Sequence, residues 1–179
     1  MANDDFQLVQ QAIAFAARAH QGHLRKDEKT PYVSHVFRVC LTVRQLFGCD
    51  DPRVLAAAVL HDTIEDTRTD YDDIAEEFGE EIAGWVAALT KNKTLPHDER
   101  EAAYARGLKE ASWQVQLCKL ADIHDNLSDS DTLQAKGVQK SLDNAQRYLD
   151  AIRAGIHKQA LAAWELVHKF YEAKRLRSA

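Results

Sequence analysis

Cysteine is scarce in this 179-residue chain, which has three cysteines, three prolines, seven glycines and one methionine. Cys40, Cys49 and Cys118 are an odd number, lie far apart and form no CxxC pair. Disulfide scaffolds carry even numbers of cysteines, and structural zinc sites use paired thiolates. The sequence therefore argues against both and favours a reducing, cytoplasmic location.

Long apolar segments and an excess of basic residues are absent as well. No run reaches the ~18 apolar residues of a membrane span, and the first residues, MANDDFQLVQ, do not resemble a secretion signal. The formal net charge is −5, whereas proteins that bind nucleic acid broadly carry excess positive charge. We therefore expect no membrane partner and no nucleic-acid partner. The oligomeric state has no signal in the sequence.

Most of the remaining pattern predicts helices. Apolar residues recur at helical spacing, and no alternation of apolar and polar residues is long enough to predict a sheet. Asp51–Pro52 is a helix start, with a capping carboxylate followed by proline at the first helical position. The expected helices cover residues 5–21, 34–47 with Ser34 as N-cap, 52 through 66, 70–78 ending at Gly79, from there to about 90, 97–110, 113–128, 139–154 and 157–176. With no linker or repeat, residues 1–179 are expected to form one all-α domain.

The segment VLAAAVLHDTIEDT, residues 54–67, combines a buried-helix pattern with polar chemistry. Seven apolar residues precede His61, Asp62, Glu65 and Asp66. On a continuous helix, residues four apart share a face, so His61 lies over Glu65 and Asp62 lies over Asp66. Two adjacent polar rows are therefore expected to extend from an apolar helix.

Three acids at a helix end are often only a solvated terminus. Two considerations oppose that interpretation here. The helix dipole disfavours acids at the carboxyl end of a helix. Burying an ionised carboxylate is also costly unless a cation or hydrogen bonds compensate. A divalent metal ion would answer both objections.

A neighbouring histidine and aspartate cannot close a metal site alone, so further ligands are expected elsewhere. His35 follows TPYVS in an apolar helical pattern, and Asp122 lies within LCKLADIHDNL. With His61 and Asp62 they offer two imidazoles and two carboxylates, which suits manganese, iron or zinc. His35 could equally be a packed core histidine and Asp122 a surface aspartate, so spacing alone leaves the ligand set open.

The order His35, His61–Asp62, Asp122 resembles the H…HD…D pattern of the HD-domain phosphohydrolases. More specifically, the chain is similar to the Rel/Spo-type hydrolase domain and to the small alarmone hydrolases, which include the metazoan SpoT homologue. The matching segments, in the family's order over about residues 5–150, are AFAARAHQGHLRKDEKTPYVSH, LAAAVLHDTIEDT, FGEEIAGWVAALTKNKTLP and KLADIHDNL. An HD pair alone is weak evidence, whereas these segments together are specific.

The resemblance implies a single HD-domain helical bundle with one manganese ion held by His35, His61, Asp62 and Asp122. It also implies hydrolysis of a small nucleotide, with ppGpp or pppGpp losing its 3′-pyrophosphate to give GDP or GTP plus pyrophosphate. Glu65 and Asp66 match the family's ED pair, which orients or deprotonates the attacking water. The residues that match its substrate contacts are Arg25, Lys26, Asn126 and, more loosely, Arg147 and Tyr148.

Some positions depart from the family. Val36 stands where relatives typically have proline, Ile123 stands where they often have a basic residue, and Asp125 adds an acid beside the last ligand. These departures leave the implied metal centre intact but open the choice of nucleotide. Neither His124 nor Asp125 has an assigned role.

Two other functions compete with alarmone hydrolysis. The same site could hydrolyse another phosphorylated nucleotide, such as the 2′-phosphate of NADPH or a nucleoside monophosphate. The domain could also bind a nucleotide without catalysis. Degenerate HD domains usually lose a ligand or the ED pair, whereas this chain keeps all six residues, which favours an enzyme.

Overall fold

The computed structural model describes residues 2–178, without the side chains of Ala2, Asn3 and Thr132. Its contacts divide the chain into two compact units, the first ending at Thr90 and the second beginning at Lys91. Within the described residues every regular element is a helix, beside one isolated β-bridge between Leu24 and Pro31. The predicted all-α class is confirmed. No described helix is both long and apolar enough to cross a membrane.

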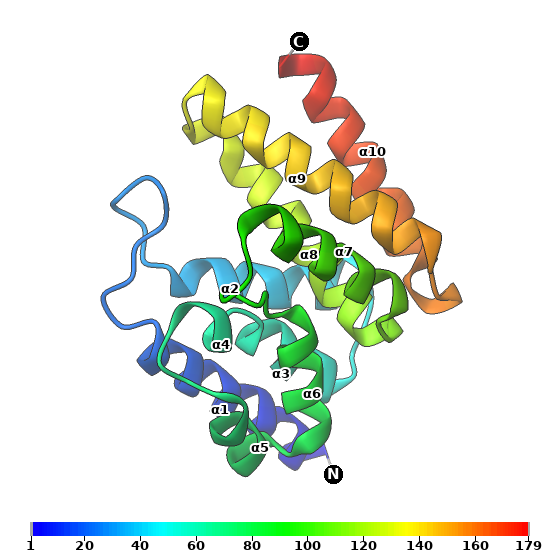
Figure 1. Ribbon diagram of the computed structural model, residues 1–179. Coiled ribbons are helices and arrows are strands. Elements are labelled where there is room, and N and C mark those ends of the chain that lie inside the picture. Colours follow the sequence, from blue (N-terminus) through cyan, green and yellow to red (C-terminus); the bar gives the residue numbers. More distant parts are fainter. Residues whose placement is uncertain (1, 179) are drawn as a thin grey trace. The chain divides into compact units, whose positions relative to one another are not determined.

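The first unit is built around α3. Its helices are α1 (Ala2–Ala19), α2 (Val33–Leu41), α3 (Pro52–Leu60), α4 (Thr63–Asp66), α5 (Tyr71–Phe78) and α6 (Glu80–Leu89). Helices α1, α2 and α6 pack against α3 (Figure 1). Every residue from Val54 to Leu60 is buried, which explains why this segment is apolar on all sides.

Helix α3 begins as predicted but ends earlier. The Asp51 side chain accepts a hydrogen bond from the Arg53 N–H at 3.0 Å. The predicted continuation through residue 66 is wrong, because Asp62 adopts φ −103° and ψ 0° and the chain restarts as α4. Side chains replace the lost helical hydrogen bonds, since the Thr63 hydroxyl donates to the Leu60 carbonyl at 2.7 Å.

This break changes the expected polar rows. The Asp66 N–H donates to the Asp62 carbonyl at 2.9 Å, so these two acids remain one turn apart. His61 is the C-cap of α3, whereas Glu65 belongs to α4. The prediction that these two residues share one continuous helix is therefore wrong.

Other helix boundaries also differ from the prediction. Helix α2 is capped at Tyr32, and Ser34 lies inside its first turn. The end of the predicted 34–47 helix is a π-helical turn, Thr42–Leu46. Helix α9 starts at Ala135, earlier than the predicted residue 139. The side chain of Gln134, at its N-cap position, forms no capping hydrogen bond.

The loop before α2 is tied at several points. The Arg25 N–H donates to the Thr30 carbonyl at 2.8 Å, and the Tyr32 N–H donates to the His23 carbonyl at 2.8 Å. The Asp27 carboxylate accepts from both the N–H and the hydroxyl of Thr30, at 2.9 Å and 2.6 Å. These bonds fix the backbone of the loop up to Tyr32, the N-cap residue of α2.

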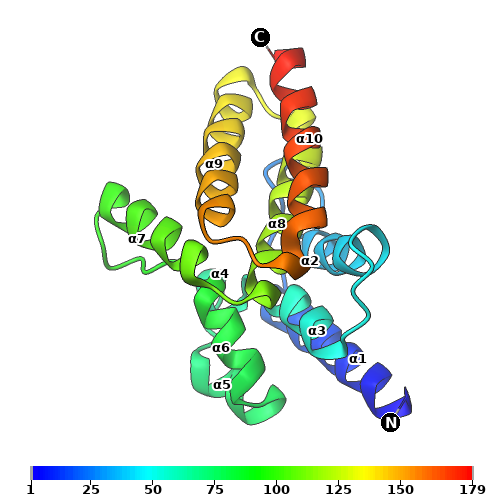
Figure 2. The same cartoon turned by 90° about the vertical axis from the view of Figure 1, so that its right-hand side faces the viewer.

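The second unit is a group of long helices. They are α7 (His97–Glu110), α8 (Trp113–Asp129), α9 (Ala135–Ala154) and α10 (Leu161–Ser178), with 3₁₀ turns at Ser130–Thr132 and Lys158–Ala160. Helix α10 therefore starts after the predicted residue 157. Helices α8, α9 and α10 lie side by side, and α7 packs on α9 (Figure 2). The buried Gln116 amide of α8 donates to the Gly155 carbonyl at 2.9 Å and accepts from the His157 N–H at 3.1 Å.

Candidate metal centre

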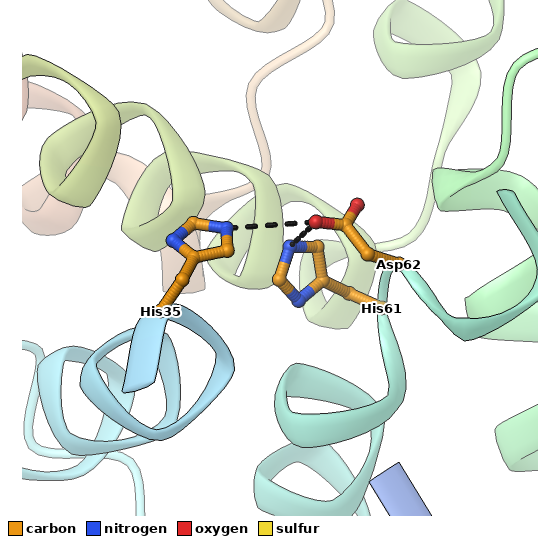
Figure 3. A group of neighbouring side chains, drawn as sticks. All are labelled: His35, His61 and Asp62. Carbon is orange, nitrogen blue, oxygen red and sulfur yellow. Dashed lines mark ion pairs between the residues drawn. The ribbon is translucent and has the colours of Figure 1, made fainter. Parts of the chain in front are cut away.

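His35 on α2 and the His61–Asp62 pair after α3 converge in the first unit (Figure 3). Asp62 Oδ2 lies 3.0 Å from His61 Nε2 and 3.5 Å from His35 Nε2. One ligand atom from each residue lies within 4.8 Å of the others. The imidazoles are buried, with 1% and 3% of their side-chain surface exposed, while the Asp62 side chain keeps 17% exposed. The structure therefore brings three of the predicted ligands together.

The orientation of His61 suits a ligand. Its Nδ1 lies 2.9 Å from the Ala58 carbonyl oxygen. Because a carbonyl oxygen only accepts, Nδ1 carries a hydrogen, so Nε2, which faces Asp62, is the ring nitrogen that a metal ion would bind. Histidines that bind metals commonly have their other ring nitrogen held in this way.

The three donor atoms fit a shared divalent cation. Two imidazole nitrogens and one carboxylate oxygen are donors that manganese, iron and zinc accept. Donors bound to one such ion at about 2.0–2.2 Å lie about 3.0–3.5 Å apart at the usual ligand–metal–ligand angles. The distances of 3.0 Å and 3.5 Å around Asp62 Oδ2 agree with that range.

Tyr32 also belongs to this site, although sequence reasoning did not select it. Its hydroxyl donates to Asp62 Oδ2 at 2.5 Å and lies 3.4 Å from Asp66 Oδ2. The available signal was its place in TPYVSH, three residues before His35, which is a helical spacing.

The ED pair lies on α4, immediately after the His35–His61–Asp62 cluster. Glu65 is half-buried and Asp66 is exposed. Asp66 Oδ2 lies 3.4 Å from the Tyr32 hydroxyl, which donates to Asp62. This placement leaves the Asp66 carboxylate accessible to water.

Arg25 and Lys26 lie in the loop before α2. The Arg25 guanidinium carbon stands 5.5 Å from the centre of the Tyr32 ring, within cation–π range. Lys26 is exposed. The Tyr32 side chain thus lies between Arg25 and Asp62 of the His35–His61–Asp62 cluster.

Asp122 lies on α8 in the second unit, where it is 6% exposed. Its Oδ2 accepts from the Lys119 ammonium at 2.7 Å, and its Oδ1 accepts from the Asn126 amide at 2.5 Å. Burial opposes protonation of Lys119, but Asp122, Tyr104 and Tyr148 together outweigh it and hold the pKa of that ammonium well above its ordinary value. Asp122 is thus a buried carboxylate with a permanent counter-charge.

Arg147 and Tyr148 surround Glu101 within the same unit. The buried Tyr148 hydroxyl donates to Glu101, and the Arg147 guanidinium lies 3.5 Å from the same carboxylate. Lys91 lies 3.2 Å from it. Burial raises the pKa of Glu101, but Tyr148 and Lys91 together bring it below the ordinary value. The two predicted substrate contacts therefore belong to a charged, hydrogen-bonded cluster.

His124 and Asp125 occupy different surroundings on α8. The His124 ring packs on Phe170 of α10, with centroids 4.6 Å apart, and burial lowers its pKa against the opposing charge of Asp125. Asp125 itself is 3% exposed. The packing of His124 gives it a structural place between two helices.

An all-helical chain with a His–Asp pair and a converging histidine has the character of an HD-domain protein. A family model described as the HD domain matches residues 12–157, a range that includes parts of both units. The chain belongs to this family, and the predicted membership is confirmed.

Particular relatives are more informative. The chain is 40% identical over 128 residues to the guanosine-3′,5′-bis(diphosphate) 3′-pyrophosphohydrolase MESH1 of Xenopus tropicalis, covering 71% of this chain and 72% of that protein. It is 40% identical over 130 residues to its counterpart in Homo sapiens, covering 72% of each. A solved structure described as a metazoan ortholog of SpoT that hydrolyzes ppGpp superposes with a TM-score of 0.80 at 28% identity, covering 90% of this chain and 94% of that one.

Proposed function

We propose that this chain is a metal-dependent phosphohydrolase that converts ppGpp or pppGpp to GDP or GTP plus pyrophosphate. The observation that carries the proposal is the convergence of His35, His61 and Asp62 in a chain of the HD-domain family. Relatives that are 40% identical are named for this activity. The proposal includes a small nucleotide as substrate, a cytoplasmic location and residues 1–179 acting as one domain.

One manganese ion, held by His35, His61, Asp62 and Asp122, is the proposed cofactor. Such an ion, when bound, lowers the pKa of its water from ~15.7 toward ~7 and offsets phosphate charge. Asp122 is included because it matches the last ligand of the family pattern. Its carboxylate is buried and accepts hydrogen bonds from Lys119 and Asn126, which hold it in one orientation on α8.

Asp66 and Glu65 are the proposed acceptors of the proton of the attacking water. The water oxygen forms a bond to the phosphorus attached to the ribose 3′ oxygen, and the bond between that phosphorus and the 3′ oxygen breaks. The departing 3′ oxygen takes a proton and becomes a hydroxyl. Asp66 suits the role because it is exposed to solvent yet lies one turn from Asp62.

Arg25, Lys26, Asn126, Arg147 and Tyr148 are the proposed substrate contacts. A guanidinium such as that of Arg25 can bind a phosphate in a forked geometry or stack on a purine. The Arg25 contact with the Tyr32 ring supports a fixed position for that group. Tyr148 would act mainly by holding Glu101, because its hydroxyl is buried in that hydrogen bond.

A substrate panel tests the proposal. Purified protein with manganese is offered ppGpp, pppGpp, NADPH and nucleoside monophosphates, and released pyrophosphate and phosphate are measured. We expect pyrophosphate from the first two substrates and none from an Asp62→Ala variant. Phosphate release from NADPH or a monophosphate alone would reassign the substrate. Tight ppGpp binding without turnover at any divalent metal would make the chain a binding module.

A further inference from the structure

Tyr32 contacts three groups whose relative positions matter for the proposed reaction. Its hydroxyl contacts the oxygen of Asp62 that faces both imidazoles, and it also approaches Asp66. The guanidinium of Arg25 lies over its ring, within cation–π range. A proposed metal ligand, a proposed proton acceptor and a proposed substrate contact therefore meet at one side chain.

The ring of Tyr32 is held firmly enough to act as a support. It stacks on the buried His20 ring, with centroids 4.7 Å apart and an interplanar angle of 28°. It also meets the His35 ring edge-on at 5.5 Å and 73°. Aromatic contacts of this kind restrict ring orientation. With its backbone tied at the start of α2, Tyr32 presents its hydroxyl in one place.

The two carboxylates share this hydroxyl unequally. At 2.5 Å, the contact with Asp62 has the length of a charge-assisted O–H···O⁻ bond, whereas 3.4 Å to Asp66 is a weak contact. A hydroxyl has one hydrogen, so it is donated to Asp62. Asp66 Oδ2 lies beside the same hydroxyl oxygen at the longer distance.

We propose that Tyr32 is a positioning residue, whose hydroxyl aims Asp62 Oδ2 at the shared cation and keeps Asp66 beside the cluster. This role rests on the proposed function for its catalytic consequence, but its effect on Asp62 concerns cation binding alone. Partners of metal-binding side chains typically contribute 10–100-fold to affinity or activity.

Tyr32→Phe removes the hydroxyl and keeps the stacked ring. We expect its affinity for Mn²⁺, measured by titration calorimetry on metal-free protein, to fall by about 10–100-fold. With saturating manganese, kcat for ppGpp should fall while KM changes little, because the ring under Arg25 remains. Tyr32→Ala removes that ring too, and it should raise KM in addition.

Tyr71→Phe is the matched control. The Tyr71 hydroxyl donates to the Glu80 carboxylate at 2.5 Å, but both residues are exposed and lie on α5 and α6. This substitution removes an equally short tyrosine–carboxylate bond outside the site. We expect it to leave Mn²⁺ affinity and kcat unchanged.

A double-mutant cycle tests the contact with Asp66 separately. If Tyr32 keeps Asp66 in place, Tyr32→Phe should reduce kcat less in an Asp66→Asn background than in the unsubstituted protein. Equal reductions in both backgrounds would remove Asp66 from the inference.

Two outcomes separate the positioning role from the proposed function, and a third overturns both. Unchanged Mn²⁺ affinity and kcat in Tyr32→Phe would overturn the inference even if alarmones are hydrolysed. Weakened Mn²⁺ binding in a protein that hydrolyses no alarmone would support it while the substrate assignment fails. Absence of Mn²⁺ binding in the unsubstituted protein would overturn both.

Discussion

At the scale of single residues, Asp62 and Asp66 carry the same carboxylate one turn apart but have different surroundings. Asp62 lies between two buried imidazoles, whereas Asp66 is exposed on α4. A buried cation depends strongly on its anionic ligand, because little water is available to replace it. A carboxylate beside the cluster affects the water more than the metal.

These surroundings predict separable effects. Asp62→Ala should lose manganese and activity together. Glu65→Ala and Asp66→Ala should keep manganese and lower kcat by about 10²–10⁴, the usual scale for loss of a general base. Metal content by mass spectrometry, measured beside kcat, checks the division. An empty site in Glu65→Ala would show that Glu65 is a ligand.

At the scale of elements, Gly79 separates α5 from α6 in a conformation that other residues avoid. Its φ of 86° and ψ of 157° lie in a region that is essentially restricted to glycine. Gly84, inside α6, has no such requirement, and a Cβ added there would meet open space. The two glycines therefore offer a matched comparison at the start and in the interior of α6.

Substitution by alanine should act in opposite directions at these positions. Gly79→Ala should lower the free energy of unfolding by about 1–3 kcal/mol through backbone strain. Gly84→Ala should raise it by about 0.5–1 kcal/mol, because alanine favours a helix interior. Urea denaturation of both variants measures the difference. Equal effects would show that the turn at Gly79 tolerates a side chain.

Helix limits were predictable where local chemistry sets them. Asp51–Pro52 and Gly79 are local signals, and the helices start and stop there. The break at His61–Asp62 was not predictable, because the same residues are compatible with a continuous helix. Hydrogen bonds from the His61 and Thr63 side chains to carbonyls of α3 accompany the turn instead.

At the scale of the whole molecule, the buried His20 makes the free energy of unfolding depend on pH. Burial, opposed by Asp62 and Asp66 and reinforced by His23 and His61, lowers the His20 pKa from 6.5 to about 4. Its Nε2 is buried without a hydrogen-bond partner among the described atoms. The unfolded chain therefore binds a proton that the folded chain resists between those two values.

The contribution of His20 is fully present above pH 6.5 and is lost as the pH falls toward about 4, with a slope of at most about 1.4 kcal/mol per pH unit. His20→Phe, which keeps a ring beside Tyr32, should flatten this slope. Urea denaturation of metal-free protein between these pH values measures it. The control, His97→Phe, changes an exposed histidine and should leave the slope of unfolding free energy against pH unchanged. An unchanged slope in His20→Phe would contradict the prediction.

By itself, the sequence determined the all-helical class, the family and the kinds of side chain available for a metal, because periodicity and motif order are written in local residue types. Only the tertiary structure decided that His35 meets His61 and Asp62, and that the Tyr32 hydroxyl reaches both acids. Those meetings depend on how α2 packs against α3. Sequence spacing sets which residues share a helical face, but packing between distant helices sets which faces meet.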